Sequence, residues 1–533
     1  MESFDSIIVG GGTAGCVLAA RLSASRQRKV LLLEAGGAKS SFWVHVPAGF
    51  GKTWRDPRFN WAFSTEPDEN THGRAIDVPR GKSLGGSSLI NGMIYVRGQP
   101  QDFDTWAQSG ATGWSFEDVL PYFKRQENFE EGSDLRGTGG PMNVVRFSEH
   151  HELLDAFIRA AEQAGFRRNP DYNGRDQEGF GYYQANQRNG RRWSAYEAYL
   201  GPALSRPNLA VRTNAQALRI EVENGRAVGI VYRMDGEERR ARASREVILA
   251  AGAVQSPHLL ELSGIGDPEV LRRAGLEVVH ALPGVGRNYQ DHYATRLNWR
   301  VKLPVTLNEL TRGWRLGRAV AQYVLTGTGI LTLGTGLAHG FVKTRPELAT
   351  PDVQYFFVHA SYANAADRVL DRKPGMTIGV TQLRPQSRGT IHVKSPDPFT
   401  PPAIRPNFLA DPIDQEVLTG GMRIARRIID EPAMDLYRSH EMSPGPGVKT
   451  DAQWLDFARR TGQTIYHPVG TCRMGRGPVA VVDPLLKVHG LEGLRVVDAS
   501  VMPTIVSANT LAAVIMIAEK GADLISEDSL NHH

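Results

Sequence analysis

The 533-residue sequence has only two cysteines, no long hydrophobic run and no large excess of charge of one sign. Cys16 and Cys472 are too few for a disulfide framework and lack metal-ligand spacing, so we expect free thiols and no metal site. The longest apolar stretch near the C-terminus, residues 511–518, is far shorter than the roughly 20 residues of a membrane-spanning helix. Residues 1–6 carry no signal-peptide pattern. We therefore expect a cytoplasmic protein without an integral membrane segment.

The net charge of +5 is the balance of 62 basic and 57 acidic residues. The most highly charged run, residues 237–246, is mixed in sign and has no interleaved aromatic residues that could stack on bases. We interpret it as a solvated face and expect no nucleic-acid partner. A chain of this length exceeds one ordinary core, which predicts two domains.

A glycine-rich motif, Gly10-Gly11-Gly12-Thr13-Ala14-Gly15, follows the apolar run 7–9 and precedes a helical stretch at 16–22. The order strand, tight turn, helix is typical of a turn that brings backbone N–H groups and a helix N-terminus close to a pyrophosphate. A second apolar run, 30–33, ends at Glu34, whose carboxylate can accept hydrogen bonds from ribose hydroxyls. These features predict a dinucleotide site but do not choose between NAD and FAD.

The rest of the chain predicts a mixed architecture. A second glycine-rich segment, residues 85–88, leads into 89–95 and permits another close approach of backbone to a ligand. Residues 300–460 alternate strands with amphipathic helices, which predicts a sheet covered by helices and a substrate domain. Helices are expected at 116–129, 151–164, 191–204, 412–428 and 510–525, and strands at 209–213, 217–223, 227–233, 247–253, 353–358, 389–393 and 494–499.

Four segments carry a resemblance to a known family: residues 81–91 (GKSLGGSSLIN), 252–266 (GAVQSPHLLELSGIG), 283–288 (PGVGRN) and 466–475 (YHPVGTCRMG). In this order they resemble the glucose-methanol-choline (GMC) family of FAD-dependent oxidoreductases, nearest to bacterial choline and alkanol dehydrogenase-like members. The resemblance implies an α/β fold (α+β overall). A Rossmann-like FAD-binding domain would comprise 1–150, 205–300 and 465–533. A substrate-binding domain, 151–204 and 301–464, would hold a mixed or antiparallel sheet covered by helices.

The resemblance also implies the cofactor contacts. FAD would be bound by Gly10, Gly12, Thr13, Ala14, Gly15, Glu34, Ala35, Trp61, Leu84, Gly85, Ser88, Asn91, Gly92, Met93, Ile94, the backbone of Ala217, Tyr466, Asp498, Ala499, Thr510 and Leu511. Relatives that bind flavin covalently through histidine have that histidine at the position of Leu89, so we expect non-covalent FAD. Many relatives read Asn-Thr-Asn-x-Pro where this chain has Asn509-Thr510-Leu511-Ala512-Ala513, which puts the placement of the terminal helix in question.

By the same resemblance His467 is the catalytic histidine and Asn509 its partner. A neutral imidazole can remove a hydroxyl proton, and an amide can donate to the developing alkoxide. The alternatives are a core histidine beside a Pro-Gly turn and a helix N-cap asparagine. Cys472 is near His467 in sequence, but we interpret it as a packing residue rather than a nucleophile.

These inferences predict oxidation of an uncharged primary alcohol, aliphatic or aromatic, to the aldehyde. His467 takes the hydroxyl proton, the hydride goes to flavin N5, and the electrons pass to oxygen or a quinone-like acceptor. Relatives that oxidise choline have a glutamate where this chain has Leu337, which argues against choline. A hydroxynitrile lyase without net redox change and a non-catalytic flavin-binding protein are the competing hypotheses.

Overall fold

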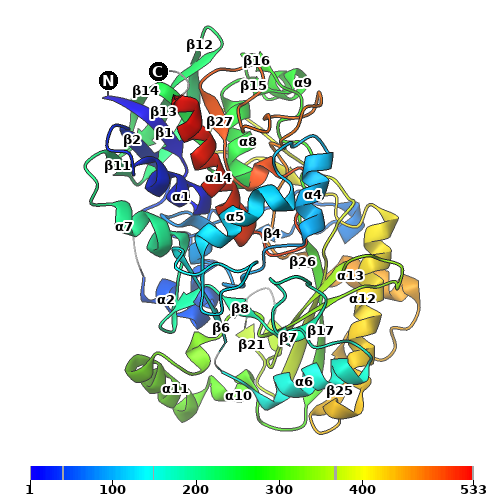
Figure 1. Cartoon of the computed structure of the whole chain (residues 1–533). Helices are drawn as coiled ribbons and strands as arrows, with labels where there is room; N and C mark the ends of the chain where they lie inside the picture. The colour runs from blue at the N-terminus through cyan, green and yellow to red at the C-terminus, as the bar shows by residue number, and fades with distance from the viewer. Residues whose placement is uncertain (1, 39–40, 148, 365–368, 531–533) are drawn as a thin grey trace.

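The computed structural model describes residues 2–38, 41–147, 149–364 and 369–530, and it contains two seven-stranded sheets in different halves of the molecule (Figure 1). The first sheet has the order β11-β2-β1-β14-β13-β12, with β27 paired to β14. Its strands are β1 (Glu2–Val9), β2 (Val30–Leu33), β11 (Leu209–Arg212), β12 (Ala215–Glu223), β13 (Arg226–Met234), β14 (Glu237–Leu249) and β27 (Leu494–Val496). Strands drawn from both ends of the chain thus meet in one sheet.

The centre of the first sheet is parallel. β1 pairs in parallel with β2 and β14, β2 with β11, and β14 with β27. All four residues of β2 are apolar and buried, as in a strand covered on both faces. β12 and β13 extend the sheet as an antiparallel hairpin. Its turn contains Asn224 and Gly225 with φ of 49° and 76°, the conformation that such residues favour in two-residue hairpin turns. This sheet confirms the predicted Rossmann-type architecture.

The charged run 237–246 forms most of β14. Side chains alternate between solvent and core in the first part of this strand, and the last four residues are buried. Arg240 and Arg242 pair with Glu221 and Glu223 of β12. The run is therefore a solvated sheet surface, as expected, and it continues directly into the buried strand. The strand ends at Leu249, earlier than the predicted residue 253, because helix α8 (Gly252–Leu262) begins three residues later.

Helices α1 (Thr13–Leu22), α5 (Phe116–Gln126) and α14 (Leu511–Leu530) pack together beside the first sheet (Figure 1). Arg21 of α1 makes two hydrogen bonds, of 2.8 and 2.7 Å, to the fully buried carboxylate of Glu519 of α14. Bidentate pairing of this kind fixes the orientation of both groups. The N-terminal motif and the terminal helix are therefore held to each other. No helix within the described residues is long and apolar enough to cross a bilayer.

The second sheet is antiparallel and has the order β25-β17-β22-β19-β18-β7, with β26 paired to β17. Its strands are β7 (Gly179–Tyr182), β17 (Tyr293–Val301), β18 (Ala338–Val342), β19 (Val353–Val358), β22 (Gly375–Gln382), β25 (Arg438–Ser443) and β26 (Gln463–Thr464). Helix α12 (Pro412–Asp430) packs on β22, and α6 (Glu152–Gln163) and α13 (Asp451–Thr461) pack on α12. This confirms a sheet covered by helices. β17 crosses the domain boundary predicted at residue 300.

The helix predicted at 191–204 is wrong in its first part. Residues 187–188 and 191–192 form an antiparallel hairpin, β9 (Gln187–Arg188) and β10 (Arg191–Arg192). The intervening Asn189 and Gly190 have φ of 52° and 70°, a left-handed pair typical of a two-residue turn. Helical structure begins only at Tyr196, with one turn of π-helix to Leu200 followed by α7 (Gly201–Ala203).

The other helices are α2 (Phe42–His45), α3 (Phe50–Thr53), α4 (Pro100–Gln108), α9 (Pro268–Arg273), α10 (Leu307–Leu310), α11 (Gly313–Thr326) and the 3₁₀ turns η1 (Pro47–Gly49), η2 (Glu69–Thr71), η3 (Gly86–Leu89), η5 (Ile330–Thr332), η6 (Pro432–Met434) and η7 (Ala499–Val501). The short strands are β3 (Phe63–Ser64), β4 (Asp77–Val78), β5 (Glu127–Phe129), β6 (Met142–Arg146), β8 (Gln184–Ala185), β15 (Ile265–Gly266), β16 (His280–Ala281), β20 (Tyr362–Asn364), β21 (Val369–Leu370), β23 (Thr390–His392) and β24 (Ala403–Arg405).

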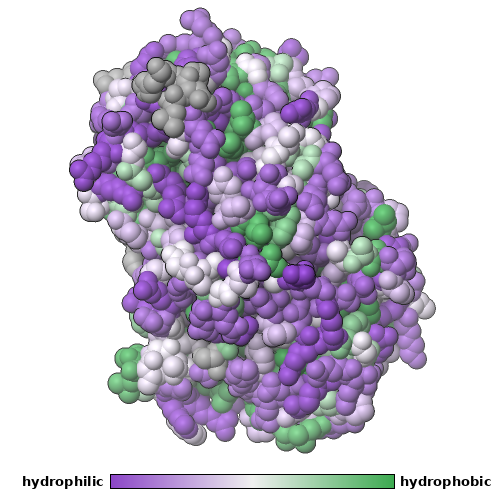
Figure 2. Space-filling model, viewed as in Figure 1, coloured by the Kyte–Doolittle hydropathy of each residue, from purple (hydrophilic) through white to green (hydrophobic). Residues whose placement is uncertain are grey.

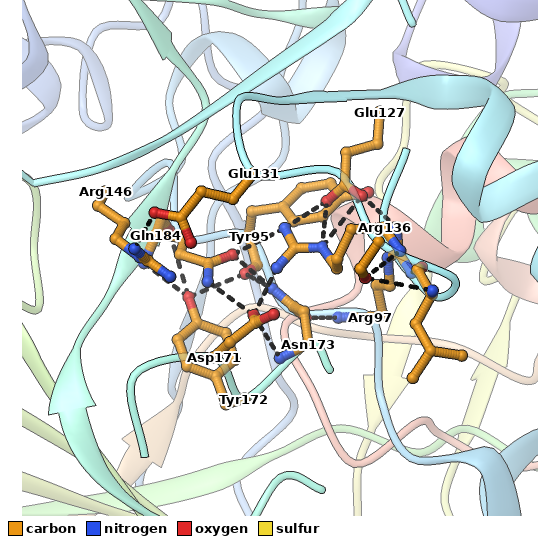
Figure 3. Close-up of polar contacts among 12 residues, drawn as sticks. Tyr95, Arg97, Glu127, Glu131, Arg136, Arg146, Asp171, Tyr172, Asn173 and Gln184 are labelled. Carbon is orange, nitrogen blue, oxygen red and sulfur yellow. Dashed lines mark hydrogen bonds and ion pairs between the residues drawn. The ribbon is translucent and has the colours of Figure 1, made fainter. Parts of the chain in front are cut away.

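A buried ionic cluster links strands β5 and β8 to the loops that carry Arg97, Arg136 and Asp171 (Figure 3). Glu127 of β5 is fully buried and pairs with both Arg97 and Arg136, whose side chains are also almost completely buried. Arg136 also pairs with Asp171, and its Nη2 atom donates to Gln184 of β8 at 3.0 Å. Buried charges are tolerated only when they are paired and hydrogen-bonded. The paired charges therefore hold these segments of the chain in fixed positions in the interior.

Candidate active site

One large cavity, of about 350 Å³, is lined by the ends of the parallel strands, the glycine-rich loops and the face of the antiparallel sheet. Most of the predicted site residues line it: Gly10, Gly12, Thr13, Ala14, Glu34, Ala35, Trp61, Ser88, Asn91, Gly92, Met93, Ile94, Ala217, Tyr466, His467, Asp498, Ala499, Asn509, Thr510 and Leu511. Gly15, Leu84 and Gly85 are not among the lining residues. Gly15 lies against Gly10, and Leu84 and Gly85 lie against Gly11, so all three pack on the first glycine turn.

The first glycine turn is shaped by close backbone contacts. Gly10 has φ of 106°, and a Cβ atom there would lie 2.6 Å from the carbonyl oxygen of Ala250. A Cβ on Gly15 would lie 1.8 Å from the carbonyl oxygen of Gly10. Helix α1 follows with Gly12 as N-cap, no side-chain cap and no acidic residue in its first turn. Its first N–H groups are thus available to an anion, and the turn fits a pyrophosphate.

Glu34 lies at the end of β2, beside this turn. Its carboxylate accepts from the backbone N–H groups of Gly11 and Gly36, both at 2.8 Å. Burial raises its pKa, and the two backbone hydrogen bonds oppose that shift. Because a carboxylate can accept about four hydrogen bonds, Glu34 retains capacity for ribose hydroxyls in the cavity.

Asp498 performs a second role besides lining the cavity. One carboxylate oxygen accepts from Gly252 N–H at 2.8 Å and Ser256 Oγ at 2.6 Å, and the other accepts from Ser500 N–H at 2.8 Å and Ser500 Oγ at 2.6 Å. Burial raises its pKa. The carboxylate therefore holds the N-terminus of α8 against η7.

The second glycine-rich segment packs on the first. Gly85 N–H donates to the carbonyl of Gly11 at 2.7 Å. A Cβ on Gly86 would approach the Cα atom of Gly12 to 2.6 Å. Asn91 is held by Arg192, which donates to its Oδ1 atom at 2.6 Å and its carbonyl at 2.8 Å. The two loops consequently form one rigid wall.

His467 lines the cavity and is held on three sides. Its backbone N–H donates to Asp291 at 2.8 Å, its Nδ1 atom lies 3.0 Å from Nδ1 of His292, and its Nε2 atom lies 3.4 Å from Nδ2 of Asn509. Burial, with His292 and Arg80 nearby, holds the pKa of His467 well below its usual 6.5. The imidazole is therefore neutral at neutral pH.

Asn509 is oriented by a chain of hydrogen bonds from the antiparallel sheet. The Tyr183 hydroxyl donates to the carbonyl of Tyr355 at 2.8 Å and accepts from Gln354 Nε2 at 2.8 Å. Gln354 Nε2 also lies 3.1 Å from Oδ1 of Asn509. The amide nitrogen of Asn509 is thereby turned toward His467.

Sequence reasoning missed several residues around the cavity. His292, the residue before β17, positions His467, and Gln354 of β19 positions Asn509. Neither His292 nor Gln354 lines the cavity. Arg80 and His258 do line it. His258 is 3% exposed, and its Nε2 atom has no hydrogen-bond partner among the described residues. His258 lies within the segment 252–266 that carries the family resemblance, but the sequence alone does not single it out. Its burial beside the cavity makes it a candidate contact to the cofactor.

Three further predictions can be compared with the structure. Cys16 and Cys472 are free and buried, as expected, and Cys472 is not a lining residue. Burial raises the pKa of the Cys472 thiol, so it is a poor nucleophile. Leu337 is 2% exposed and does not line the cavity, whose wall is formed instead by Phe356 and Val358 of β19.

The fold and cavity define a dinucleotide-binding enzyme with a histidine at the face of a second sheet. Comparison with known proteins agrees. Residues 4–294 and 385–518 match two domain models, each described as GMC oxidoreductase, and the chain belongs to this family.

Two curated relatives and one solved structure extend the match over the whole chain. An alcohol dehydrogenase [acceptor] from Pseudomonas putida is 40% identical, covering 98% of this chain and 95% of the relative. An oxygen-dependent choline dehydrogenase from Chromohalobacter salexigens is 42% identical with the same coverage. The crystal structure of pyridoxine 4-oxidase from Mesorbium loti superposes with a TM-score of 0.89 at 30% identity, covering 99% of each chain.

Proposed function

We propose that this FAD-dependent oxidoreductase of the GMC family converts an uncharged primary alcohol, aliphatic or aromatic, to the aldehyde. FAD fits the cavity through the uncapped N-terminus of α1, the carboxylate of Glu34 and the wall formed by the two glycine loops. Solved structures similar to this chain include that of an FAD-dependent oxidoreductase from Chaetomium thermophilum. Residue 89 is leucine, whereas relatives that bind flavin covalently have a histidine at this position. This difference supports non-covalent binding of FAD.

The observation that carries the proposal is the pair of contacts made by His292, to Leu383 and to His467, from which the tautomer of His467 follows. His292 Nε2 lies 3.0 Å from the carbonyl of Leu383, which can only accept, so that nitrogen carries a hydrogen. Burial lowers the pKa of His292 to about 4, so its Nδ1 atom is unprotonated and accepts from Nδ1–H of His467. The lone pair of His467 Nε2 then faces the amide nitrogen of Asn509 at 3.4 Å, a long contact that an alcohol hydroxyl can replace when it gives its proton to Nε2.

The alcohol gives up a proton and a hydride to become the aldehyde. His467 Nε2 takes the proton, and Asn509 Nδ2 donates to the developing alkoxide. When bound, FAD would supply the acceptor for the hydride and the route by which the two electrons reach oxygen or a quinone-like acceptor.

Charge around the cavity supports an uncharged substrate. Among the described lining residues the only carboxylates are Glu34 and Asp498, and both accept hydrogen bonds from the protein. Arg80 and Arg296 also line the cavity. A quaternary ammonium group such as that of choline would find two cations and no unengaged carboxylate. Relatives named for choline and for alcohol are about equally similar to this chain, so the cavity is the better guide.

Anaerobic mixing of the purified holoenzyme with an alcohol panel tests the proposal. Uncharged primary alcohols are expected to bleach the flavin spectrum faster than choline, and His467→Gln is expected to slow bleaching at least about a hundredfold. Reoxidation by oxygen or by a quinone then identifies the acceptor. Absence of bleaching by every alcohol, with cleavage of a cyanohydrin, would favour a hydroxynitrile lyase. Fastest bleaching by choline would contradict the substrate assignment.

A further inference from the structure

Helix α11 stands out on the molecular surface because it is almost entirely exposed. Of its fourteen residues only Ala319 and Tyr323 are buried. Trp314, Val324 and Leu325 have exposed fractions of 73%, 67% and 83%. Figure 2 shows hydrophobic atoms at the lower left edge of the molecule, where Figure 1 places α11. Exposed apolar side chains concentrated on one helix mark an interaction surface.

The exposed apolar and polar residues of α11 lie on different faces of the helix. At 3.6 residues per turn, Leu316, Val320 and Val324 fall in one row, and Trp314 and Leu325 continue the same face. Arg315 and Arg318 lie on the adjacent side, next to Gln322 and Thr326. This pattern of a wide apolar face flanked by arginine is typical of helices that lie in the interface of a bilayer.

Helix α2 adds a second apolar element. Phe42 and Trp43 are 61% and 46% exposed. α2 packs on η1, η1 on η5, and η5 on α11, and both helices lie on the same side of the molecule in Figure 1. We call the exposed apolar and basic residues of α2 and α11 the basic apolar face.

The charge of these segments indicates which class of partner the basic apolar face binds. No acidic residue occurs between Glu34 and Asp56 or between Glu309 and Glu347, whereas both stretches contain lysine or arginine. A two-fold dimer through this face would bring the arginines of α11 toward identical arginines without a carboxylate from either stretch to compensate them. Anionic lipid headgroups supply that compensation, and tryptophan is favoured at the membrane interface.

The basic apolar face also adjoins the cavity along the chain. Phe50 and Trp54, directly after α2 and η1, line the cavity, as does Thr335, shortly after η5. We propose that the basic apolar face docks the enzyme on an anionic lipid bilayer, with this part of the cavity wall toward the membrane. This docking is independent of the identity of the alcohol.

Co-sedimentation of the holoenzyme with lipid vesicles tests the docking. Binding is expected to vesicles that contain phosphatidylglycerol, to weaken with vesicles of phosphatidylcholine alone, and to fall at high salt. R315E/R318E is expected to weaken binding about thirtyfold or more, and V324S/L325S about tenfold or more.

Matched controls come from other surfaces. R272E/R273E removes two exposed arginines of α9, which lies at the opposite end of the molecule in Figure 1, and Leu436→Ser removes an apolar side chain that is 61% exposed. Both are expected to bind vesicles like the parent protein. Turnover with a water-soluble dye acceptor is expected to be unchanged in every variant, which shows that each is folded. Equal vesicle binding by all variants would overturn the proposal, as would a dimer that V324S/L325S dissociates.

Discussion

The Nδ1 atoms of His292 and His467 lie 3.0 Å apart, and the two rings are arranged edge to face. His292 is thus a positioning residue that fixes the tautomer of His467 without touching the cavity. We expect His292→Leu, which offers no acceptor, to slow alcohol-dependent flavin reduction at least about tenfold with little change in substrate affinity. His292→Asn, whose Oδ1 atom can accept in place of Nδ1, is expected to recover most of the rate. Equal rates in the two variants would remove the tautomer argument.

In the proposed mechanism His467 takes the hydroxyl proton, so the acid limb of the pH–rate profile is expected to report its protonation. Its pKa lies well below 6.5, so the proton-accepting neutral form persists as the pH falls through 6.5. We expect kcat/KM for an uncharged alcohol to stay constant from pH 8 to pH 6 and to decline only at lower pH. An acid limb centred at or above pH 6.5 would show that burial does not control this histidine.

The two glycines of the first turn differ in what they tolerate. Gly10→Ala places a methyl group 2.6 Å from the Ala250 carbonyl at a positive φ, and we expect it to lower thermal stability or prevent folding. In Gly12→Ala the nearest atoms are 4.0 Å away, so the chain is expected to fold, but its methyl group enters the cavity. Melting curves and retained flavin absorbance measure the two effects. Normal flavin content in Gly12→Ala would contradict the assigned pyrophosphate position.

His258 offers the cavity a buried nitrogen that has no hydrogen-bond partner in the described part of the chain. A hydrogen bond from this atom to the dinucleotide would contribute about 0.5–1.5 kcal/mol. We therefore expect His258→Leu to release FAD about two- to tenfold more readily, and His258→Gln to be closer to the parent protein. Fluorescence of released flavin after dilution measures the difference. Equal release from the parent and both variants would show that His258 serves packing only.

The cluster in Figure 3 predicts a contrast between two glutamates. Glu127→Gln leaves Arg97 and Arg136 buried with less compensation, which is expected to cost about 3–5 kcal/mol. Glu131→Gln breaks only the exposed pair with Arg146, for which we expect about 0–1 kcal/mol. Urea denaturation of both variants measures the free energies of unfolding. Similar losses would mean that burial does not decide the contribution of these pairs.

Local patterns predicted the parts of the fold that depend on local physics. The motif from Gly10 to Gly15, the buried strand before Glu34 and the strands at 217–223 and 227–233 are readable because each depends on residues adjacent in the chain, the two strands through the Asn-Gly turn between them. The Asn189-Gly190 turn carried the same signal and was overlooked. By contrast, His292 and Gln354 meet His467 and Asn509 only through tertiary packing of the second sheet. No spacing in the sequence encodes that meeting.

The residues that line the cavity come from almost the whole sequence, the first being Val9 and the last Val514. The parallel sheet likewise pairs β1 with β14 and β14 with β27. On a ribosome that adds about 5–20 residues per second, roughly 25–100 s separate the emergence of the glycine turn from that of Asp498. For that period the turn exists without the residues that hold α8 and complete the site. The nascent chain must therefore avoid aggregation while β14 still lacks its partner β27. Tight binding of the cofactor is expected only after the chain has left the ribosome.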